Sequence, residues 1–201
     1  MDPPMRKVPR TRRGRETLVT IMEAALQEFG EKGFHEGSIS EISRRANLAP
    51  GGIYNYFDSK DEIFRALVTD INVQFRDQIA AQVRTAADEM TAEKRVLETG
   101  INFVRQHKGI YRIVTEAEFI YPEGHRALYE ALVERVGNRL RDGALSGEIR
   151  PDVGEIHAWA IIGINVMLAL RYGVWAADEA PDRVSAVVND MLKHGLNSRT
   201  T

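Results

Sequence analysis

Residues 38–60 read SISEISRRANLAPGGIYNYFDSK, and this stretch decides the fold. Ser38 and Glu41 have the spacing of a capping box, in which each side chain accepts a hydrogen bond from a free backbone N–H, so a helix is predicted to begin at Ile39. Asn47 is predicted to end this helix, because Asn tolerates the left-handed conformation that is common at helix C-termini.

A second short helix is predicted directly after the turn. Pro50 has the fixed φ and the missing N–H that suit a first helical position. Gly51 and Gly52 would then lie in the first turn, where each costs roughly 1 kcal/mol, so some requirement must favour small residues. Close approach of a duplex to the N-terminus of the helix is such a requirement. Two short helices joined by so brief a turn form a helix-turn-helix.

Polar side chains follow the two glycines and are predicted to contact DNA. Tyr54, Asn55 and Tyr56 can form hydrogen bonds with phosphates or base edges. The S-x-x-E spacing recurs at residue 59, so a further helix is expected to begin near Lys60. A cation at the start of a helix opposes the macrodipole, which indicates that Lys60 faces a phosphate.

From about Ala25 to Phe64 the chain resembles the DNA-binding domain of the TetR/AcrR family of transcriptional regulators. The matching positions are Phe29, Gly33, Phe34, Ser38, Ile39, Ile42, Ala46, Leu48, Gly51, Ile53, Tyr54, Tyr56, Phe57, Ser59, Lys60 and Ile63. The chain departs from the family at Ser43, Asn47, Ala49 and Gly52. At Ala49 and Gly52 it lacks hydroxyl groups that could contact DNA.

The predicted DNA-binding residues are of three kinds: charged residues, residues that can form hydrogen bonds, and glycines that let the DNA approach the backbone. They are Arg12, Arg13, Ser38, Arg44, Arg45, Gly51, Gly52, Tyr54, Asn55, Tyr56 and Lys60.

The charge distribution supports this assignment. The 201 residues carry a net charge of only −2, but residues 1–15 hold six basic residues against one acidic residue, whereas residues 61–201 hold 17 basic and 21 acidic residues. A basic arm on an acidic body is typical of a DNA-binding module attached to a body with another task. A basic N-terminus alone is more often a solvated tail, but its position before a helix-turn-helix favours contact with DNA.

Other classes of protein find little support. The chain has no cysteine, which excludes disulfides and thiol nucleophiles. The five histidines show no metal-binding spacing, and no Walker, G-x-S-x-G or G-x-G-x-x-G motif occurs. We therefore predict no catalytic residue, metal or cofactor. An enzyme with an appended helix-turn-helix remains an alternative, as does a helical module whose small domain binds a protein partner instead of DNA.

The N-terminus has no apolar signal-peptide core. The longest apolar run, Ala158–Leu170, is interrupted by Gly163 and Asn165, and it is shorter than the ~20 residues that span a bilayer. A cytoplasmic protein with no membrane partner is expected.

The predicted fold is all-α, with about nine helices. A basic flexible arm (1–14) precedes a helix-turn-helix DNA-binding domain (15–60) and a ligand-binding and dimerisation domain (61–201). The first helix is expected at about 15–32, before Gly33. Apolar periodicity and breaker residues place the others at about 60–84, 91–107, 109–120, 123–146, 152–176 and 181–196.

Helix 152–176 is apolar on most sides, and such a helix is normally buried. In the family that the chain resembles, the last two helices pair with their copies, which implies a homodimer on a palindromic operator. Burial within one subunit is the alternative.

Polar and aromatic residues within the apolar helices could line a small-molecule pocket. The predicted ligand-binding residues are Arg105, Tyr111, Arg112, Glu116, Phe119, Tyr129, Trp159, Asn165 and Arg171. Any one of them could equally be a surface charge, an ion pair or a core aromatic.

Two segments, Tyr111–Tyr121 and Gly147–Asp152, resemble a branch of the family that often responds to acyl-CoA thioesters of fatty or aryl acids. Such an effector favours cationic anchors. The predicted function is a ligand-responsive repressor that an apolar or acyl-CoA-like effector, or an aromatic acid, releases from its operator. The effector would act by moving helix 60–84.

Overall fold

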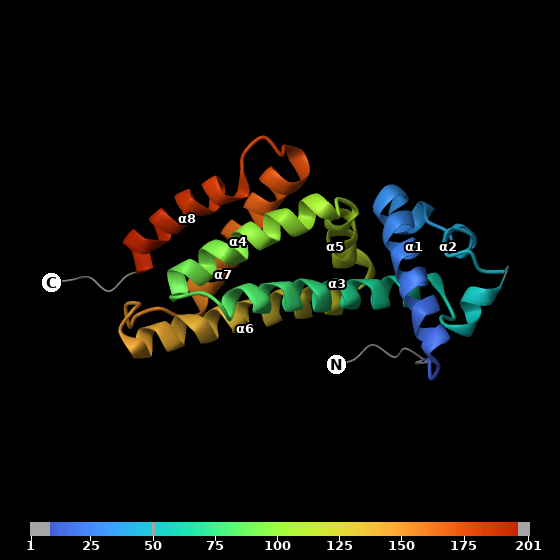
Figure 1. The fold of residues 1–201 in the computed structure, drawn as a ribbon, viewed down its shortest axis with the longest axis horizontal. Coiled ribbons are helices and arrows are strands. Elements are labelled where there is room, and N and C mark those ends of the chain that lie inside the picture. Colours follow the sequence, from blue (N-terminus) through green and yellow to red (C-terminus); the bar gives the residue numbers. More distant parts are fainter. Residues whose placement is uncertain (1–8, 50, 197–201) are drawn as a thin grey trace. The chain divides into compact units, whose positions relative to one another are not determined.

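The computed structural model describes residues 9–49 and 51–196, and within these ranges the fold is all-α, as predicted (Figure 1). The eight α-helices are α1 (Arg12–Glu36), α2 (Ile39–Arg45), α3 (Lys60–Val83), α4 (Glu89–Gln106), α5 (Gly109–Ile120), α6 (Pro122–Ser146), α7 (Glu155–Ala169) and α8 (Pro181–Leu196). A 3₁₀-helix, η1 (Gly52–Asn55), precedes α3, and a π-helix, η2 (Leu170–Trp175), follows α7.

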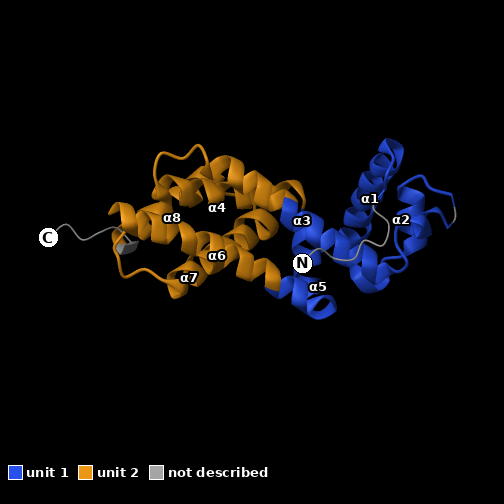
Figure 2. Ribbon diagram, turned by 90° about the horizontal axis from the view of Figure 1, so that it is seen from below, with its two compact units in different colours: residues 1–73, 108–126 blue, residues 74–107, 127–201 orange. Residues whose placement is uncertain are grey.

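The chain divides into two compact units (Figure 2). Unit 1 contains Met1–Val73 and Lys108–Arg126, and unit 2 contains Gln74–His107 and Ala127–Thr201. Unit 1 is larger than the DNA-binding domain predicted at residues 15–60, because it includes the first part of α3 and all of α5. The chain therefore passes between the units at three places.

Helix α1 begins at Arg12, about three residues earlier than expected. Thr11 is the reason, since its hydroxyl accepts a hydrogen bond from the Gly14 N–H at 3.1 Å and so caps the helix. The last residues of the predicted flexible arm are thus helical, while residues 1–8 lie outside the described part of the chain. Phe29 and Phe34 of α1 pack edge-on against Phe64 of α3, with ring centroids 5.5 and 5.1 Å apart, and form the core of unit 1.

Gly33 breaks α1 with a left-handed φ of 82°, as the sequence indicated, but the helix resumes and ends only at Glu36. Helix α5 packs on this region. Its Glu116 accepts a hydrogen bond from the Phe34 N–H at 2.6 Å. The backbones of Gly30 and Gly109 cross so closely that a Cβ on Gly30 would lie 2.8 Å from the Gly109 Cα. Glycine is therefore required on both helices at the crossing.

In unit 2, α4 packs against α7, η2 and α8 (Figure 1). The interior contains two apolar clusters. The Met90 cluster consists of Met90, Val133, Val136, Leu140, Ile149, Ala158, Ile161 and Ile162. The Leu97 cluster consists of Leu97, Ile101 and Val184.

Helix α7 is more exposed than its composition suggests. Ile156, Trp159 and Met167 are 83%, 43% and 55% exposed. Together with η2, α7 forms a 21-residue segment, Glu155–Trp175, that is long and apolar enough to cross a membrane. This corrects the expectation that the apolar run is too short, because the helix extends beyond the run at both ends. A single such helix is weak evidence for a membrane span.

Replacing Gly33 by Ala should lower the free energy of unfolding by roughly 1–3 kcal/mol from the backbone alone, because a φ of 82° with a ψ of 172° is a conformation that few residues besides glycine adopt. A further loss is expected because the new Cβ would lie 2.5 Å from Glu116 Oε1. Gly147→Ala is a matched control, since Gly147 also has a φ of 82° but no atom within 4 Å of its Cβ position. Urea unfolding should show a larger loss for Gly33→Ala. Equal losses would contradict a close packing of Glu116 on Gly33.

Candidate functional site

Helix α2 is capped partly as predicted. The Ser38 hydroxyl accepts the Glu41 N–H at 3.2 Å. The capping box also predicts a hydrogen bond from the Ser38 N–H to the Glu41 carboxylate. The Ser38 N–H instead donates to Glu28 Oε1, at 3.3 Å. At the other end, Asn47 has a φ of 53° and ends the helix in the expected left-handed conformation.

The segment after the turn is a single 3₁₀ turn instead of an α-helix. Gly51 lies before it with a φ of 84°, and a Cβ there would meet no atom within 4 Å. Gly51 is therefore required for its left-handed conformation, and space is open around it. Pro50, the predicted first residue of the helix, lies outside the described residues. Ile53 and Phe57 are fully buried and anchor the segment in unit 1.

The polar side chains of this segment lie on the surface. Tyr54 is 51% exposed, Asn55 is exposed and Tyr56 is partly exposed. They begin three residues after Gly51, and the 3₁₀-helix η1 that carries the first two of them contacts α2. This surface presents three hydrogen-bonding side chains next to an unobstructed stretch of backbone.

The two arginines of α2 are held by acidic residues. Arg44 donates to both carboxylate oxygens of Glu41, at 2.9 and 2.5 Å. This hydrogen bonding lowers the pKa of Glu41 to about 2, so Glu41 stays ionised near neutral pH. Arg45 binds both carboxylate oxygens of Glu31, at 3.2 and 2.6 Å, and its side chain is only 18% exposed. The hydrogen bond from Arg45 also lowers the pKa of Glu31.

Glu28 organises this network and was not predicted from the sequence. It is fully buried, and its carboxylate contacts Lys32 Nζ at 3.0 Å, Arg45 Nε at 3.3 Å and the Ser38 N–H. Such partners are needed to offset the cost of burying a charge. A signal was available, because Glu28 follows Ile21, Ala24 and Ala25 at positions i+7, i+4 and i+3, on the inward face of α1.

Lys60 points into unit 1. Its ammonium group donates to the carbonyl oxygens of Phe34, His35 and Gly37 at 2.8, 3.1 and 3.1 Å, and it lies 4.6 Å from the centre of the Phe34 ring. An ammonium group has three donors, and these three bonds use all of them. The carbonyl groups at the end of α1 therefore account for the cation at the start of α3, and a contact with a phosphate is not needed to explain it.

Arg12 and Arg13 lie in the first turn of α1 and are exposed. Arg12 forms an exposed ion pair with Glu16 at 2.8 Å. Surface pairs of this kind contribute little stability, so the Arg12 side chain can leave Glu16 and reorient toward a phosphate.

The nine predicted ligand-binding residues do not form one site within either unit. Tyr111, Arg112, Glu116 and Phe119 belong to unit 1, and the other five belong to unit 2. The cationic anchors have protein partners. Arg105 donates to the carbonyl oxygens of Tyr172 and Glu179, at 2.9 and 2.6 Å, Arg112 donates to the Glu31 carbonyl at 2.5 Å, and Arg171 pairs with Asp178 at 3.3 Å.

The remaining predicted ligand residues differ in their surroundings. Phe119 is 81% exposed, and Trp159 lies on the exposed face of α7. Tyr111 is partly buried, and Tyr129 packs against the Met90 cluster. Asn165 has a buried side-chain nitrogen without a hydrogen-bond partner in the described part of the chain.

Comparisons with known proteins agree with this fold. Residues 21–67 match the family model described as "Bacterial regulatory proteins, tetR family". The chain is 28% identical over 175 residues to the HTH-type transcriptional regulator UidR of Escherichia coli, which covers 83% of each chain. It is 31% identical over 115 residues to the regulator YdgC of Bacillus subtilis, covering 55% of this chain and 57% of that one.

Solved structures show the same fold at low sequence identity. The fatty acid degradation regulator FadR from Bacillus halodurans superposes with a TM-score of 0.77 at 20% identity, covering 90% of this chain and all of that one. FadR from Bacillus subtilis, solved in complex with stearoyl-CoA, gives 0.76 at 20% identity, covering 87% and 97%.

The capped α2, the turn and the exposed η1 segment define a helix-turn-helix DNA-binding regulator with a second helical unit. Its relatives are transcriptional regulators, and no catalytic family is indicated. The family match over residues 21–67, the similar regulators and the shared fold together support a TetR-family transcriptional regulator.

Glu28→Gln should lower the free energy of unfolding by roughly 3 kcal/mol, because it breaks a buried ion pair and leaves cations without their partner. Glu31→Gln is the control, since the Glu31 side chain is 60% exposed and its loss should change little. Both variants can be compared by urea unfolding. A Glu28→Gln protein as stable as wild type would mean that Glu28 does not organise the helix-turn-helix.

Proposed function

We propose that the protein is a homodimeric repressor that binds a palindromic operator and is released by a small apolar or acyl-CoA-like effector, in the cytoplasm. The observation that carries this proposal is the exposed segment from Gly51 to Tyr56, held beside a capped α2. A duplex can reach this backbone without obstruction, because space is open at Gly51. Hydrogen bonds from Tyr54, Asn55 and Tyr56 would then read base edges or phosphates.

The predicted cations take two different roles in this proposal. Arg12, Arg13 and Arg44 are exposed and supply charge to the phosphates. Arg45 and Lys60 are held by partners within unit 1 and fix the orientation of the helix-turn-helix. Ser38 acts as a helix cap beside the groove.

The exposed apolar face of unit 2 supports the proposed dimer. On α7, Ile156, Trp159, Gly163 and Met167 recur at the spacing of one helix face, and all four are exposed. On α8, the exposed residues Val187 and Met191 are one turn apart. No atom lies within 4 Å of a Cβ position at Gly163, which leaves room for a side chain of a second copy. A two-fold dimer would cover this face on both copies.

The proposed effector acts through the segments that connect the units. Helix α3 has residues in both units, and α5 is joined to unit 2 at both of its ends. Within unit 1, Glu116 and Arg112 of α5 hold the end of α1. An effector that displaced α5 or α3 would change the population that is competent to bind DNA. The stearoyl-CoA complex of FadR supports an acyl-CoA-like effector.

The DNA-binding proposal can be tested by selecting duplexes from a random pool on the purified protein. The selected sequences should contain a palindrome, because the proposed reader is a two-fold dimer. On the selected duplex, Arg13→Gln should reduce the salt slope of log K by about 1.8, since it removes one phosphate contact from each subunit of the dimer. Arg45→Gln should lower affinity without changing the slope. Failure to enrich any duplex would favour a protein-binding module, and a reduced slope for Arg45→Gln would make Arg45 a phosphate contact.

The dimer can be tested with Gly163→Arg, which places a charge in the centre of the exposed face of α7. This variant should be monomeric at concentrations where the wild-type protein is a dimer, as measured by analytical ultracentrifugation. Leu145→Arg is the control, because Leu145 is 88% exposed but lies on α6. A Gly163→Arg protein that remained dimeric would exclude this face as the interface.

A further inference from the structure

The 3₁₀-helix η1 has an inner and an outer side. A 3₁₀-helix has three residues per turn, so side chains three residues apart lie on the same side. Ile53 is fully buried, and Tyr56, three residues later, is partly buried on that inner side. Tyr54 is 51% exposed and Asn55 is exposed. These two side chains therefore form the outer side of η1.

The stretch between α2 and α3 carries little charge. Among residues 46–59, only Asp58 is charged at neutral pH, and it lies beyond η1. The cations on either side of the stretch are held within unit 1. Arg45 binds the Glu31 carboxylate, and Lys60 donates to three carbonyl oxygens. Guanine is most often read by the paired donors of Arg or Lys, and the stretch itself supplies neither.

Arg44 is the exposed cation of α2, and its donors are partly occupied. Its side chain is 71% exposed, and its Nε and Nη2 donate to the two carboxylate oxygens of Glu41, at 2.9 and 2.5 Å. This pairing uses an edge of the guanidinium group that would otherwise suit the two acceptors of guanine. A guanidinium group has five N–H donors, so the others remain available to a phosphate. Arg44 therefore suits the role of a phosphate contact better than that of a base reader.

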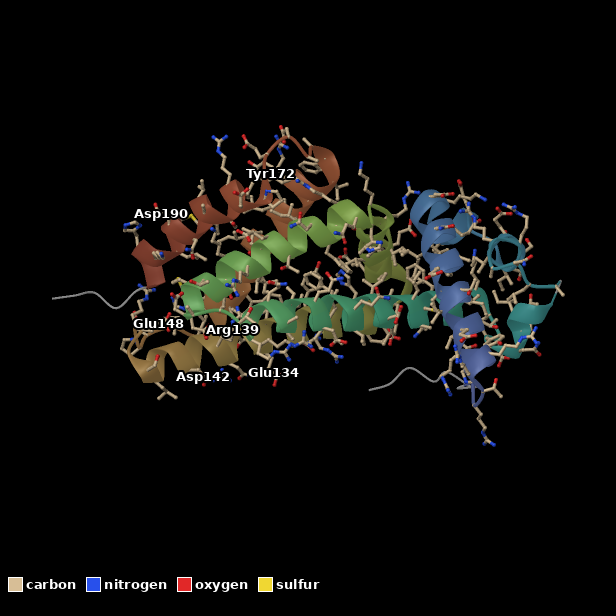
Figure 3. All side chains as sticks on the ribbon, viewed as in Figure 1. Glu134, Arg139, Asp142, Glu148, Tyr172 and Asp190 are labelled. Atoms are coloured by element: carbon tan, nitrogen blue, oxygen red, sulfur yellow. The ribbon has the colours of Figure 1, made fainter. Side chains whose placement is uncertain are left out.

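The carboxamide of Asn55 has the chemistry of a base reader. Nitrogen and oxygen atoms of side chains occur along both units (Figure 3), so exposure alone does not identify such a residue. A carboxamide carries an acceptor oxygen and a donor NH₂ group side by side. In the major groove, adenine presents the complementary pair, the N7 acceptor and the N6 donor. Guanine presents two acceptors there, so the amide oxygen would face an acceptor.

The residues around Asn55 compete little with it for a base edge. No atom lies within 4 Å of a Cβ position at Gly51. Ala49 and Gly52 supply no hydrogen-bonding side chain. Tyr54 has a single hydroxyl group, which serves as donor or acceptor and so discriminates less between bases. The donor and acceptor of Asn55 are therefore the pair on the outer side of η1 that can select a base.

We propose that Asn55 reads an adenine in each half-site of the operator, through the major groove. Its amide oxygen would accept a hydrogen bond from adenine N6, and its NH₂ group would donate to N7. This inference rests on the proposed function, because it requires that the η1 segment faces DNA. It adds the base, the groove and the residue that selects the base.

Duplexes selected from a random pool test the base preference. The full-length protein should enrich adenine at one position of each half-site, and Asn55→Ala should lose the preference at that position alone. Replacing this A·T pair by G·C in one half-site should weaken wild-type binding by about tenfold, and should affect Asn55→Ala much less. Asn55→Arg should prefer guanine at the same position. A wild-type adenine preference that Asn55→Ala leaves unchanged would overturn the inference.

A duplex with 7-deazaadenine at that position tests the contact without any change in the protein. This base still pairs with thymine but lacks the N7 acceptor. Wild-type protein should bind the modified duplex several-fold more weakly than the unmodified one, whereas Asn55→Ala should bind both alike. Equal binding of the two duplexes by the wild-type protein would mean that adenine is preferred for its effect on DNA shape, and this would overturn the inference.

Asn47→Gly is the matched control. Asn47 is the other carboxamide of the stretch and is also exposed. Its φ of 53° is one that glycine adopts without strain, so the variant removes the side chain and keeps the turn. The adenine preference should persist in Asn47→Gly, and its loss there but not in Asn55→Ala would overturn the assignment.

The selection separates this inference from the proposed function. A palindrome with guanine at the position that Asn55 controls would contradict the inference and leave the repressor proposal intact. Failure to enrich any duplex would contradict both.

Discussion

The end of α1 is the constraint on which the DNA-binding unit depends. The left-handed break at Gly33 leaves backbone groups without helical partners, and side chains from three elements satisfy them. Lys60 of α3 takes three carbonyl oxygens, Glu116 of α5 takes the Phe34 N–H, and Glu28 of α1 takes the Ser38 N–H. Each of these bonds holds the connection between α1 and α2, so the direction of α2 depends on all of them.

The bonds of Lys60 and Arg45 within unit 1 limit which positive charges are available to DNA. A cation placed next to a helix-turn-helix suggests a phosphate contact, but Arg45 and Lys60 compensate buried carboxylate and carbonyl groups. In the proposed function these two residues therefore orient the helix-turn-helix and do not contact phosphates. The charge that we propose for phosphate contact therefore comes from the exposed side chains of Arg12, Arg13 and Arg44.

Sequence patterns predicted the features that depend on residues close together in the chain, such as helix ends and caps. Breaker residues placed α5 and α8 at their observed bounds, and the cap at Ser38 and the left-handed Asn47 follow from neighbouring residues alone. The partners of Glu28 and Glu116 could not be predicted in this way. Glu116 accepts a hydrogen bond from a backbone group 82 residues away. Rules based on residue spacing do not predict a contact over such a separation. The predicted ligand residues stay a prediction. They are divided between the two units because their helix faces were assigned without knowing which helices pack together.

Unit 2 carries an exposed apolar face on α7 and α8. A second copy that covered this face would stabilise the unit by removing apolar surface from water. A ligand or partner that binds only the folded unit stabilises it by RT ln(1 + [L]/Kd). The chain crosses between the units within α3, between α4 and α5, and within α6, so the proposed coupling of effector binding to DNA binding would act through these segments. Because such coupling is reciprocal, an effector that weakens DNA binding must itself bind more weakly, by the same factor, when the operator is bound.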